Sequence, residues 1–249
     1  MKYYSTRDKA LARPCSLREA VEAGASVIDV GGYSSRPGAD EVSPEEEWRR
    51  VDLGVGAVRS LSSDLPVSID TFRSSVAARA IHKYGKVIIN DISAGELDPL
   101  IVDVAAEHDV PYVAMHMKGD PRTMQSMTDY RDIVAEVVDY FRERTAQLRE
   151  RGVRRIVVDP GFGFAKTLEQ NYELLRGLHR LAELGYPVLA GVSRKSMIYK
   201  LLGTTPAEAL NGTTALHWEC LRQGAVILRA HDTREAVEVV RMFDQFMQA

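Results

Sequence analysis

The stretch Arg155-Ile-Val-Val-Asp159-Pro-Gly-Phe-Gly-Phe-Ala-Lys166 contains the unit from which this chain is built. A short run of β-branched residues comes first, an acidic residue follows it directly, and a glycine-rich loop leads into helix-like sequence. Runs this short and this apolar are typical of parallel strands that are buried on both faces. We therefore predict a strand over Arg155–Val158 with a polar residue at its end.

Runs of the same kind recur from one end of the chain to the other. We predict seven strands: Ala25–Val30, Pro66–Ile69, Val87–Ile89, Pro111–Met115, Arg155–Val158, Pro187–Gly191 and Ala225–Leu228. Charged stretches with helical periodicity separate them. Ser43 is expected to cap one helix, with Glu46 in capping-box spacing, and residues 129–151 and 233–247 are expected to form two more.

This alternation predicts a parallel sheet, either open or closed into a barrel. No GxGxxG follows an early strand, so the TIM (β/α)8-type barrel is favoured over a dinucleotide-binding sheet. The 249 residues contain no linker or short repeat, which predicts a single domain over residues 1–249. A barrel needs eight strands, however, and residues 5–23 look helical. The expectation is a barrel that lacks its first β-strand.

Composition excludes several function classes. Hydrophobic residues make up 45% of the chain, charged residues 27%, and the net charge is −3, which does not indicate a nucleic-acid-binding protein. No apolar run reaches the roughly 20 residues of a membrane span. Cys15 and Cys220 lie far apart and are read as free thiols in a reducing cytosol. Without an apolar leader, the cytoplasm is the expected location.

Polar residues end all seven predicted strands, where parallel β/α folds gather their chemistry. Asp70, Asn90 and Asp159 form an acceptor-rich set that suits a heterocycle with several N–H donors. The alternative interpretation is ordinary helix capping and strand-end hydrogen bonding.

A second set of strand-end residues is cationic. It consists of Arg36, Lys195, Arg229 and His231, with Ser34 and Ser35 beside the first. A small-residue turn can present backbone N–H groups and a guanidinium to phosphate, so these residues are predicted to clamp a diphosphate. A lone strand-end cation is more often structural, but four together repel one another unless an anion is present.

Apolar side chains beside these residues could wall a flat ring. The candidates are Phe162, Phe164, Met115 and Met117. Core packing is the stronger interpretation for the methionines, whereas the loop around Phe164 favours a ligand contact.

Seven motifs, in order and in register, resemble the dihydropteroate synthase family. They are Ile28-Asp-Val-Gly-Gly-Tyr-Ser-Ser-Arg-Pro-Gly-Ala39, Ser68-Ile-Asp-Thr71, Asn90-Asp91, Met115-His-Met117, Asp159-Pro-Gly-Phe-Gly-Phe-Ala-Lys166, Ser193-Arg-Lys-Ser196 and Arg229-Ala-His-Asp232. The resemblance covers the chain from Ala23 to its end. It implies a pterin-binding β/α barrel that joins 6-hydroxymethyl-7,8-dihydropterin diphosphate to p-aminobenzoate in folate biosynthesis, releasing diphosphate.

The resemblance also implies roles for individual residues. Three would hold the pterin and one would lie near both substrates: Asp70, Asn90, Asp159 and Lys195. The diphosphate would be held by Ser35, Arg36, Arg229 and His231, and p-aminobenzoate by Phe164 and Ser196. Met115 is assigned to substrate binding on its own chemistry, as a wall for a flat ring. The family further implies Mg²⁺ and a homodimer. Asp70, Asp159 and Lys195 are the residues expected to carry the catalysis.

One family motif has no counterpart here. The first strand of the family carries an Asn-Val-Thr-Pro-type loop whose Asn ligates Mg²⁺, and the first Asn of this chain is Asn90. No metal ligand is therefore assigned, and the chain is expected to be N-terminally truncated and to release little diphosphate.

Other functions stay open at this level. A pterin-binding methyltransferase would share the barrel and the pterin-facing residues, but not the cationic strand ends. Lys195 could instead be the Schiff-base lysine of an aldolase. A third alternative is a non-catalytic remnant that binds pterin or serves only in oligomerisation.

Overall fold

A computed structural model describes residues 2–4, 16–34, 41–120 and 123–248. Its eight strands are all parallel and lie in one sheet, in sequence order. The strands are β1 Lys2–Tyr4, β2 Ile28–Gly31, β3 Val67–Asp70, β4 Ile88–Asp91, β5 Tyr112–Met115, β6 Ile156–Asp159, β7 Val188–Ala190 and β8 Ala225–Leu228. The TIM-like (β/α)-barrel class predicted from the alternation is confirmed.

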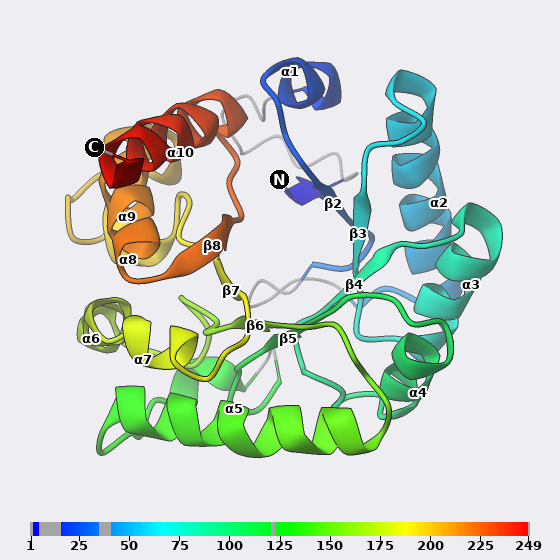
Figure 1. Ribbon diagram of the computed structural model, residues 1–249, viewed down its shortest axis with the longest axis horizontal. Helices are drawn as coiled ribbons and strands as arrows, with labels where there is room; N and C mark the ends of the chain where they lie inside the picture. Colours follow the sequence, from blue (N-terminus) through cyan, green and yellow to red (C-terminus); the bar gives the residue numbers. More distant parts are fainter. Residues whose placement is uncertain (1, 5–15, 35–40, 121–122, 249) are drawn as a thin grey trace.

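Helices lie around the outside of the curled sheet (Figure 1). They are α1 Leu17–Glu22, α2 Pro44–Leu61, α3 Ser74–Tyr84, α4 Leu100–Glu107, α5 Ile133–Glu150, α6 Leu168–Arg176, α7 His179–Ala182, α8 Ser196–Tyr199, α9 Leu210–Arg222 and α10 Thr233–Gln248. Two 3-10 turns, Met124–Ser126 and Pro206–Glu208, complete the described helices. Ser43 caps α2 as predicted, accepting from the Glu46 amide at 3.2 Å, while the Glu46 carboxylate pairs with Arg49 and Arg50.

The strands between β2 and β6 are buried because helices cover their outer faces. Ile69, Ile89 and Tyr112 are fully enclosed in the main core. Each of the seven predicted strands overlaps an observed one, but several extend one or two residues further, so Asp70 and Asp159 are the last residues of their strands. The polar groups are therefore held by strand pairing rather than by the loops.

At the place of the expected missing first strand, the structure has only a three-residue strand, β1. Lys2–Tyr4 forms β1 and pairs in parallel with β2, in the register Lys2↔Asp29 and Tyr4↔Gly31. Three residues are too few to be recognised as a strand from local sequence, and the neighbouring strand supplies the pairing. In the helix-like stretch that follows, Leu17–Glu22 is helical and capped by Ser16, while residues 5–15 lie outside the described part of the chain.

The last two strands are less regular than the others. β6 and β7 share one register pair, Val158↔Val188, and the β7–β8 register shifts between Val188 and Leu189. Val226 and Ile227 of β8 are 66% and 37% exposed. Over the described residues no pairing joins β8 to β1, so the curled sheet has a seam there.

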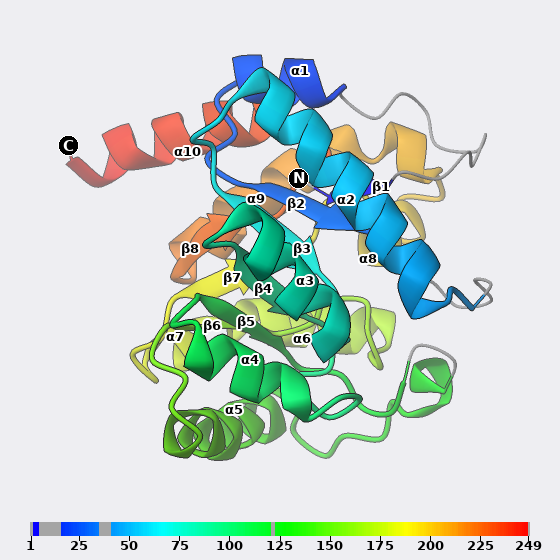
Figure 2. The same ribbon diagram turned by 90° about the vertical axis from the view of Figure 1, so that its right-hand side faces the viewer.

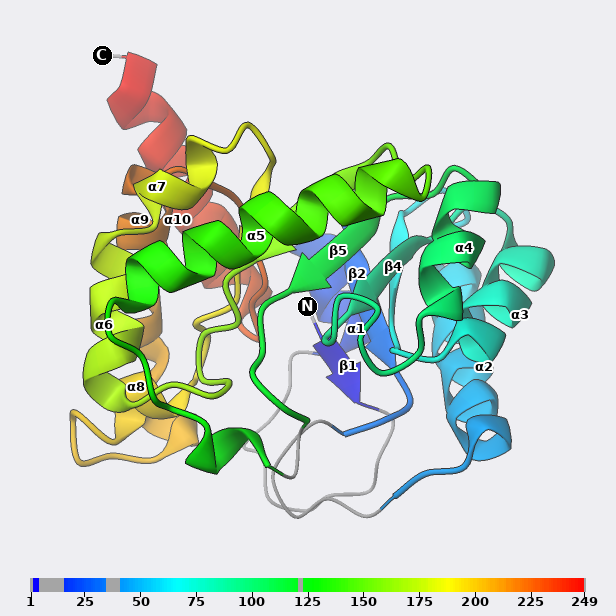
Figure 3. The same ribbon diagram turned by 90° about the horizontal axis from the view of Figure 1, so that it is seen from below.

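The C-terminal end of α10 projects beyond the other helices (Figures 2 and 3). Its exposed side chains include Met242, Phe246 and Met247. None of the helices in the described ranges is long and apolar enough to cross a membrane. Cys220 is a buried free thiol, as expected, and Cys15 lies outside the described residues.

Candidate active site

The acceptor-rich set converges as predicted. The register pairs Gly31 with Asp70 and Asp70 with Asn90, which puts these residues at one level of neighbouring strands. Asp159 ends β6 and pairs with Met115 of β5. All three polar side chains are buried, with Asp159 fully enclosed. Three such groups in an apolar core require polar partners, either in the protein or in a ligand.

Asn90 has one partner and one unused acceptor. Its Nδ2 donates to Asp29 Oδ2 at 3.0 Å, whereas the buried Oδ1 has no hydrogen-bond partner. An unpaired buried oxygen costs free energy unless a donor reaches it. The geometry therefore suits a ligand that carries an N–H group.

Asp29 belongs to this set, although sequence reasoning did not assign it to the site. The available signal was an acidic residue inside the apolar run of β2, where a buried charge requires polar partners. Asp91, next to Asn90, serves another purpose because successive strand residues face opposite sides. Its carboxylate accepts from Ser93, Gly95 and Tyr112, which fixes the loop after β4.

Arg229 connects the two predicted sets. It directly follows β8, and its Nη2 donates to Asp159 Oδ2 at 2.7 Å. Gly191 makes room for it, since a Cβ there would lie 2.8 Å from Nη2. Although burial opposes the charge, the carboxylates of Asp159, Asp29 and Asp70 raise the pKa of Arg229. In this structure the guanidinium points into the acidic row, so Arg229 links the acceptor-rich set to the cationic one.

Lys195, which follows β7, lies beside Phe164 of the loop after β6. The Lys195 Nζ donates to the Phe162 carbonyl and lies 4.8 Å from the centre of the Phe164 ring. Phe164 is half-buried, whereas Phe162 is enclosed in the main core. Ser196 follows Lys195 as the first residue of α8. The ring and the ammonium thus present one surface to a flat, anionic ligand.

His231 is anchored to the loop after β7. Its backbone N–H donates to Ser193 Oγ at 3.1 Å, and its Nδ1 lies 3.0 Å from the same oxygen. Arg194 and Asp232 join the same two loops through contacts of 2.8 and 2.6 Å. Arg194 is therefore a structural cation of its motif, and His231 is oriented by a hydroxyl.

The remaining predicted residues divide into two groups. Ser35 and Arg36 lie outside the described residues. Met115 is buried in a small cluster with Ile92 and Met117, against which Phe164 packs. Met115 is thus part of the apolar cluster that carries Phe164.

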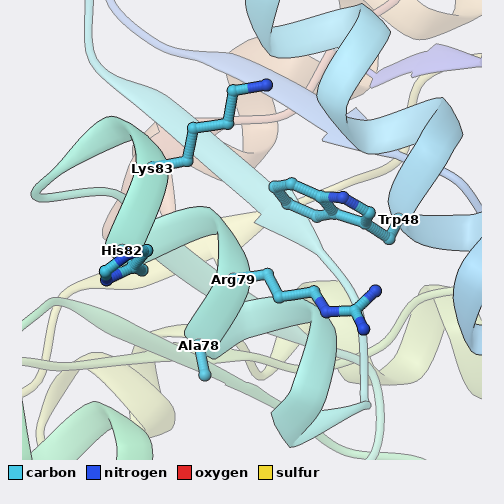
Figure 4. Close-up of a pocket in the computed structure, with 5 residues that line it drawn as sticks. All are labelled: Trp48, Ala78, Arg79, His82 and Lys83. Atoms are coloured by element: carbon cyan, nitrogen blue, oxygen red, sulfur yellow. The ribbon is translucent and has the colours of Figure 1, made fainter.

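The hollow shown in Figure 4 is a different feature. It has a volume of about 570 Å³ and lies between α2 and α3, lined by Trp48, Ala78, Arg79, His82 and Lys83. No strand-end residue lines it, and Lys83 is engaged there with Asp52 at 2.6 Å. The strand ends, rather than this outer hollow, are the candidate active site.

Comparison with known proteins agrees with this geometry. The profile of the family described as "Pterin binding enzyme" matches residues 4–231. The dihydropteroate synthase of Synechocystis is 42% identical over 237 residues, which are 93% of this chain and 81% of that protein.

Solved structures give the same result. Dihydropteroate synthase from Thermus thermophilus in complex with 4-aminobenzoate matches with a TM-score of 0.88 and 40% identity, over 98% of this chain and 92% of that one. The same enzyme in complex with 6HMPPP matches with a TM-score of 0.81 and 38% identity, over 93% and 87% of the two chains. The chain therefore belongs to the pterin-binding enzyme family, among the dihydropteroate synthases, which are transferases.

Proposed function

We propose that this chain joins 6-hydroxymethyl-7,8-dihydropterin diphosphate to p-aminobenzoate at the carboxyl ends of its strands. The observation that carries the proposal is the unpaired, buried Oδ1 of Asn90 within a row of carboxylates. A pterin ring has several N–H donors on one edge, and a carboxylate or amide oxygen can accept each of them. Asp70, Asn90 and Asp159 are assigned to that edge.

The diphosphate is assigned to the cationic strand ends. Arg229 and His231 lie on the loop after β8, and Ser35 and Arg36 are expected to contribute from the loop after β2. Arg229 is now neutralised by Asp159. Diphosphate oxygens would compete with that carboxylate for the guanidinium, because both offer paired acceptors to its planar fork.

p-Aminobenzoate is assigned to the surface made by Phe164, Lys195 and Ser196. Its ring can stack on Phe164, which packs against the cluster that includes Met115. Its carboxylate can accept from the Ser196 hydroxyl or from backbone N–H groups at the start of α8. The arylamine then faces the methylene carbon of the pterin substrate.

The reaction needs no protein nucleophile. The C–O bond between the methylene carbon on the pterin ring and the diphosphate breaks first, and both bonding electrons leave with the diphosphate. The arylamine nitrogen attacks the resulting cation and loses a proton. Asp70 and Asp159 stabilise the cationic pterin, while Lys195, Arg229 and His231 stabilise the departing anion.

Mg²⁺ is implied by the family, but the residues described here do not fit a protein-held ion. Those residues contain no cluster of three or more His, Cys, Asp or Glu side chains with metal-ligand geometry, and the family's Asn has no counterpart in the sequence. Magnesium commonly binds through substrate phosphates and water. We propose that any Mg²⁺ arrives on the diphosphate, so that titration of the substrate-free chain with Mg²⁺ gives no binding isotherm.

The assembly and location follow as proposals. The exposed apolar end of α10, with Met242, Phe246 and Met247, supports a homodimer, which sedimentation can test. The single sheet supports one domain over residues 1–249. The unpaired Cys220 thiol supports a cytoplasmic location.

Diphosphate release by the purified chain tests the function. We expect release that requires both substrates in the presence of Mg²⁺, together with calorimetric binding of the pterin diphosphate. Because the Asn-Val-Thr-Pro-type motif has no counterpart in this chain, we predict that the same assay shows slow diphosphate release. Binding of pterin without any turnover would select the non-catalytic alternative, and methyl transfer from a methylated folate would select the methyltransferase.

A further inference from the structure

Lys166 is a buried lysine to which the proposed reaction gives no role. It lies on the loop after β6, and it is only 8% exposed. Its Nζ contacts the carbonyl oxygens of Gly161 and Phe164 at 3.1 and 2.9 Å, and His116 Nδ1 at 3.0 Å. The three contacts match the three N–H donors of the ammonium form, and the two carbonyls also match the two N–H donors of the neutral amine. The side chain is held inside the loop on which it lies.

The loop requires such a tie because its backbone is unusual. Gly161, Gly163 and Ala165 have φ angles of +67°, +79° and +50°. A Cβ on Gly161 would overlap the His116 carbonyl oxygen, so only glycine fits there. Ala165 has a side chain and is buried, which makes its left-handed conformation costly. These turns direct the loop carbonyls inward, toward Nζ.

Asp159 at the end of β6 and Phe164 in the loop after it are fixed by different contacts. Asp159 belongs to β6, pairs with Met115, and its carbonyl accepts from the His116 N–H at 2.9 Å. Phe164 lies beyond the strand, and its carbonyl accepts from Lys166. Loss of Lys166 should therefore displace Phe164 more than Asp159.

We propose that Lys166, braced by His116, is a positioning residue that sets Phe164 for the p-aminobenzoate half of the reaction. The proposal rests on the proposed function, since Phe164 must contact p-aminobenzoate. Lys166 acts through the loop backbone and touches neither substrate. His116 is oriented for this role by Tyr140, whose ring lies edge-on at 4.8 Å.

Burial works against the positive charge of Lys166. Burial lowers its pKa to about 7, Asp159 acts in the opposite direction, and Lys118 adds to the lowering. Burial, with Lys166 and Lys118, also lowers the pKa of His116 well below its usual value, so the imidazole is neutral. A neutral imidazole can accept a hydrogen bond from Nζ through its unprotonated ring nitrogen.

Steady-state kinetics of Lys166→Met and Lys166→Gln, each with both substrates varied, test the proposal. In Lys166→Met we expect KM for p-aminobenzoate to rise about 10-fold and KM for the pterin diphosphate to change less than about twofold. Lys166→Gln retains two N–H donors and should recover part of the loss. It also serves as the test if the Met variant does not fold.

Lys83→Met is the matched control. Lys83 ties α3 to α2 through Asp52 at 2.6 Å, and the variant should leave both KM values unchanged. Equal changes in both KM values of Lys166→Met, or lowered thermal stability with unchanged kinetics of the folded enzyme, would overturn the proposal.

Phe164→Ala separates this proposal from the function on which it rests. If Phe164→Ala raises KM for p-aminobenzoate and Lys166→Met does not, only the role of Lys166 fails. If Phe164→Ala has no effect on that KM, the assigned p-aminobenzoate surface fails. A wild-type chain that binds neither substrate contradicts the function itself.

A second measurement checks the burial of Nζ. The folded pKa of about 7 lies below the ordinary value of 10.5, so between these pH values the unfolded chain holds more protons than the folded one. The free energy of unfolding of the wild type should therefore rise with pH in this window relative to Lys166→Met, with a slope of about one proton. Equal slopes would mean that Nζ is solvated, which would contradict the proposed contacts.

Discussion

The strands from β2 to β6 and the last two strands, β7 and β8, hold functional residues in different ways. In the first region the parallel pairing is regular, the core side chains are enclosed, and Asp70, Asn90 and Asp159 lie within strands. In the second region the register shifts, and Val226 and Ile227 are exposed. The acceptors are thus held by the sheet, whereas the cations stand on loops beside its irregular edge.

This difference indicates two half-sites. The fixed half-site consists of Asp70, Asn90 and Asp159, and the adjustable half-site consists of Arg229 and His231. Acceptors for a flat heterocycle need constant positions, because hydrogen bonds weaken steeply with misalignment. Cations that receive a diphosphate and release it again need alternative partners. Arg229 has one in Asp159, and His231 has one in Ser193.

The largest expected effect comes from breaking the link between the two regions. Asp159→Asn removes the carboxylate opposite Arg229 while keeping an oxygen for the Gly161 N–H. We expect kcat/KM to fall by about 100- to 1,000-fold, because a buried charge loses its partner and the pterin cation loses a stabilising group.

Asp103→Asn provides a matched control for this variant. It removes the carboxylate of an exposed ion pair with Arg151, and its kcat/KM should stay within about twofold of the wild type. Similar losses in the two variants would contradict a special role for the Arg229 pair.

The fixed half-site is tested separately by Asn90→Ala. This variant removes the unpaired Oδ1 and leaves Asp29 without its amide donor. Calorimetry should show pterin binding weakened by about 10- to 100-fold. Asn211→Ala, at an exposed asparagine of α9, should bind as the wild type does. Unchanged pterin affinity in Asn90→Ala would remove the acceptor set from the site.

The adjustable half-site is tested by His231→Ala. We expect KM for the pterin diphosphate to rise by about 10-fold, since one charge-assisted contact to phosphate is lost. Affinity for the same pterin without its diphosphate should not change. His82→Ala, at an exposed histidine of α3, is the control. Equal weakening for both ligands would place His231 among the pterin contacts instead.

The smallest expected effect compares the two regions by one substitution. Ile69→Val in β3 removes a fully buried methyl group and should lower the free energy of unfolding by about 1 kcal/mol. Ile227→Val in β8, at a side chain that is 37% exposed, should lower the free energy of unfolding by only about 0.3 kcal/mol. Chemical denaturation measures both, and equal costs would mean that β8 is covered in solution.

Much of the fold could be predicted because it rests on local patterns. Short β-branched runs and the capping residue Ser43 act within a few neighbours, and their elements lie where they were predicted. β1 could not be recognised in this way because three residues carry too little pattern. Its pairing with β2 depends on a partner more than 20 residues away along the chain.

The site shows the same limit. The identities of Asp70, Asn90, Asp159, Lys195, Arg229 and His231 follow from where the apolar runs stop. Side-chain identity and strand ends are properties of the chain itself. Which groups touch is decided by the tertiary structure: Arg229 reaches Asp159 across the sheet past Gly191, Asn90 meets Asp29, and Lys166 turns inward to its own loop. Those contacts join segments that are distant in sequence, and they form because a buried polar group requires a partner wherever the fold brings one.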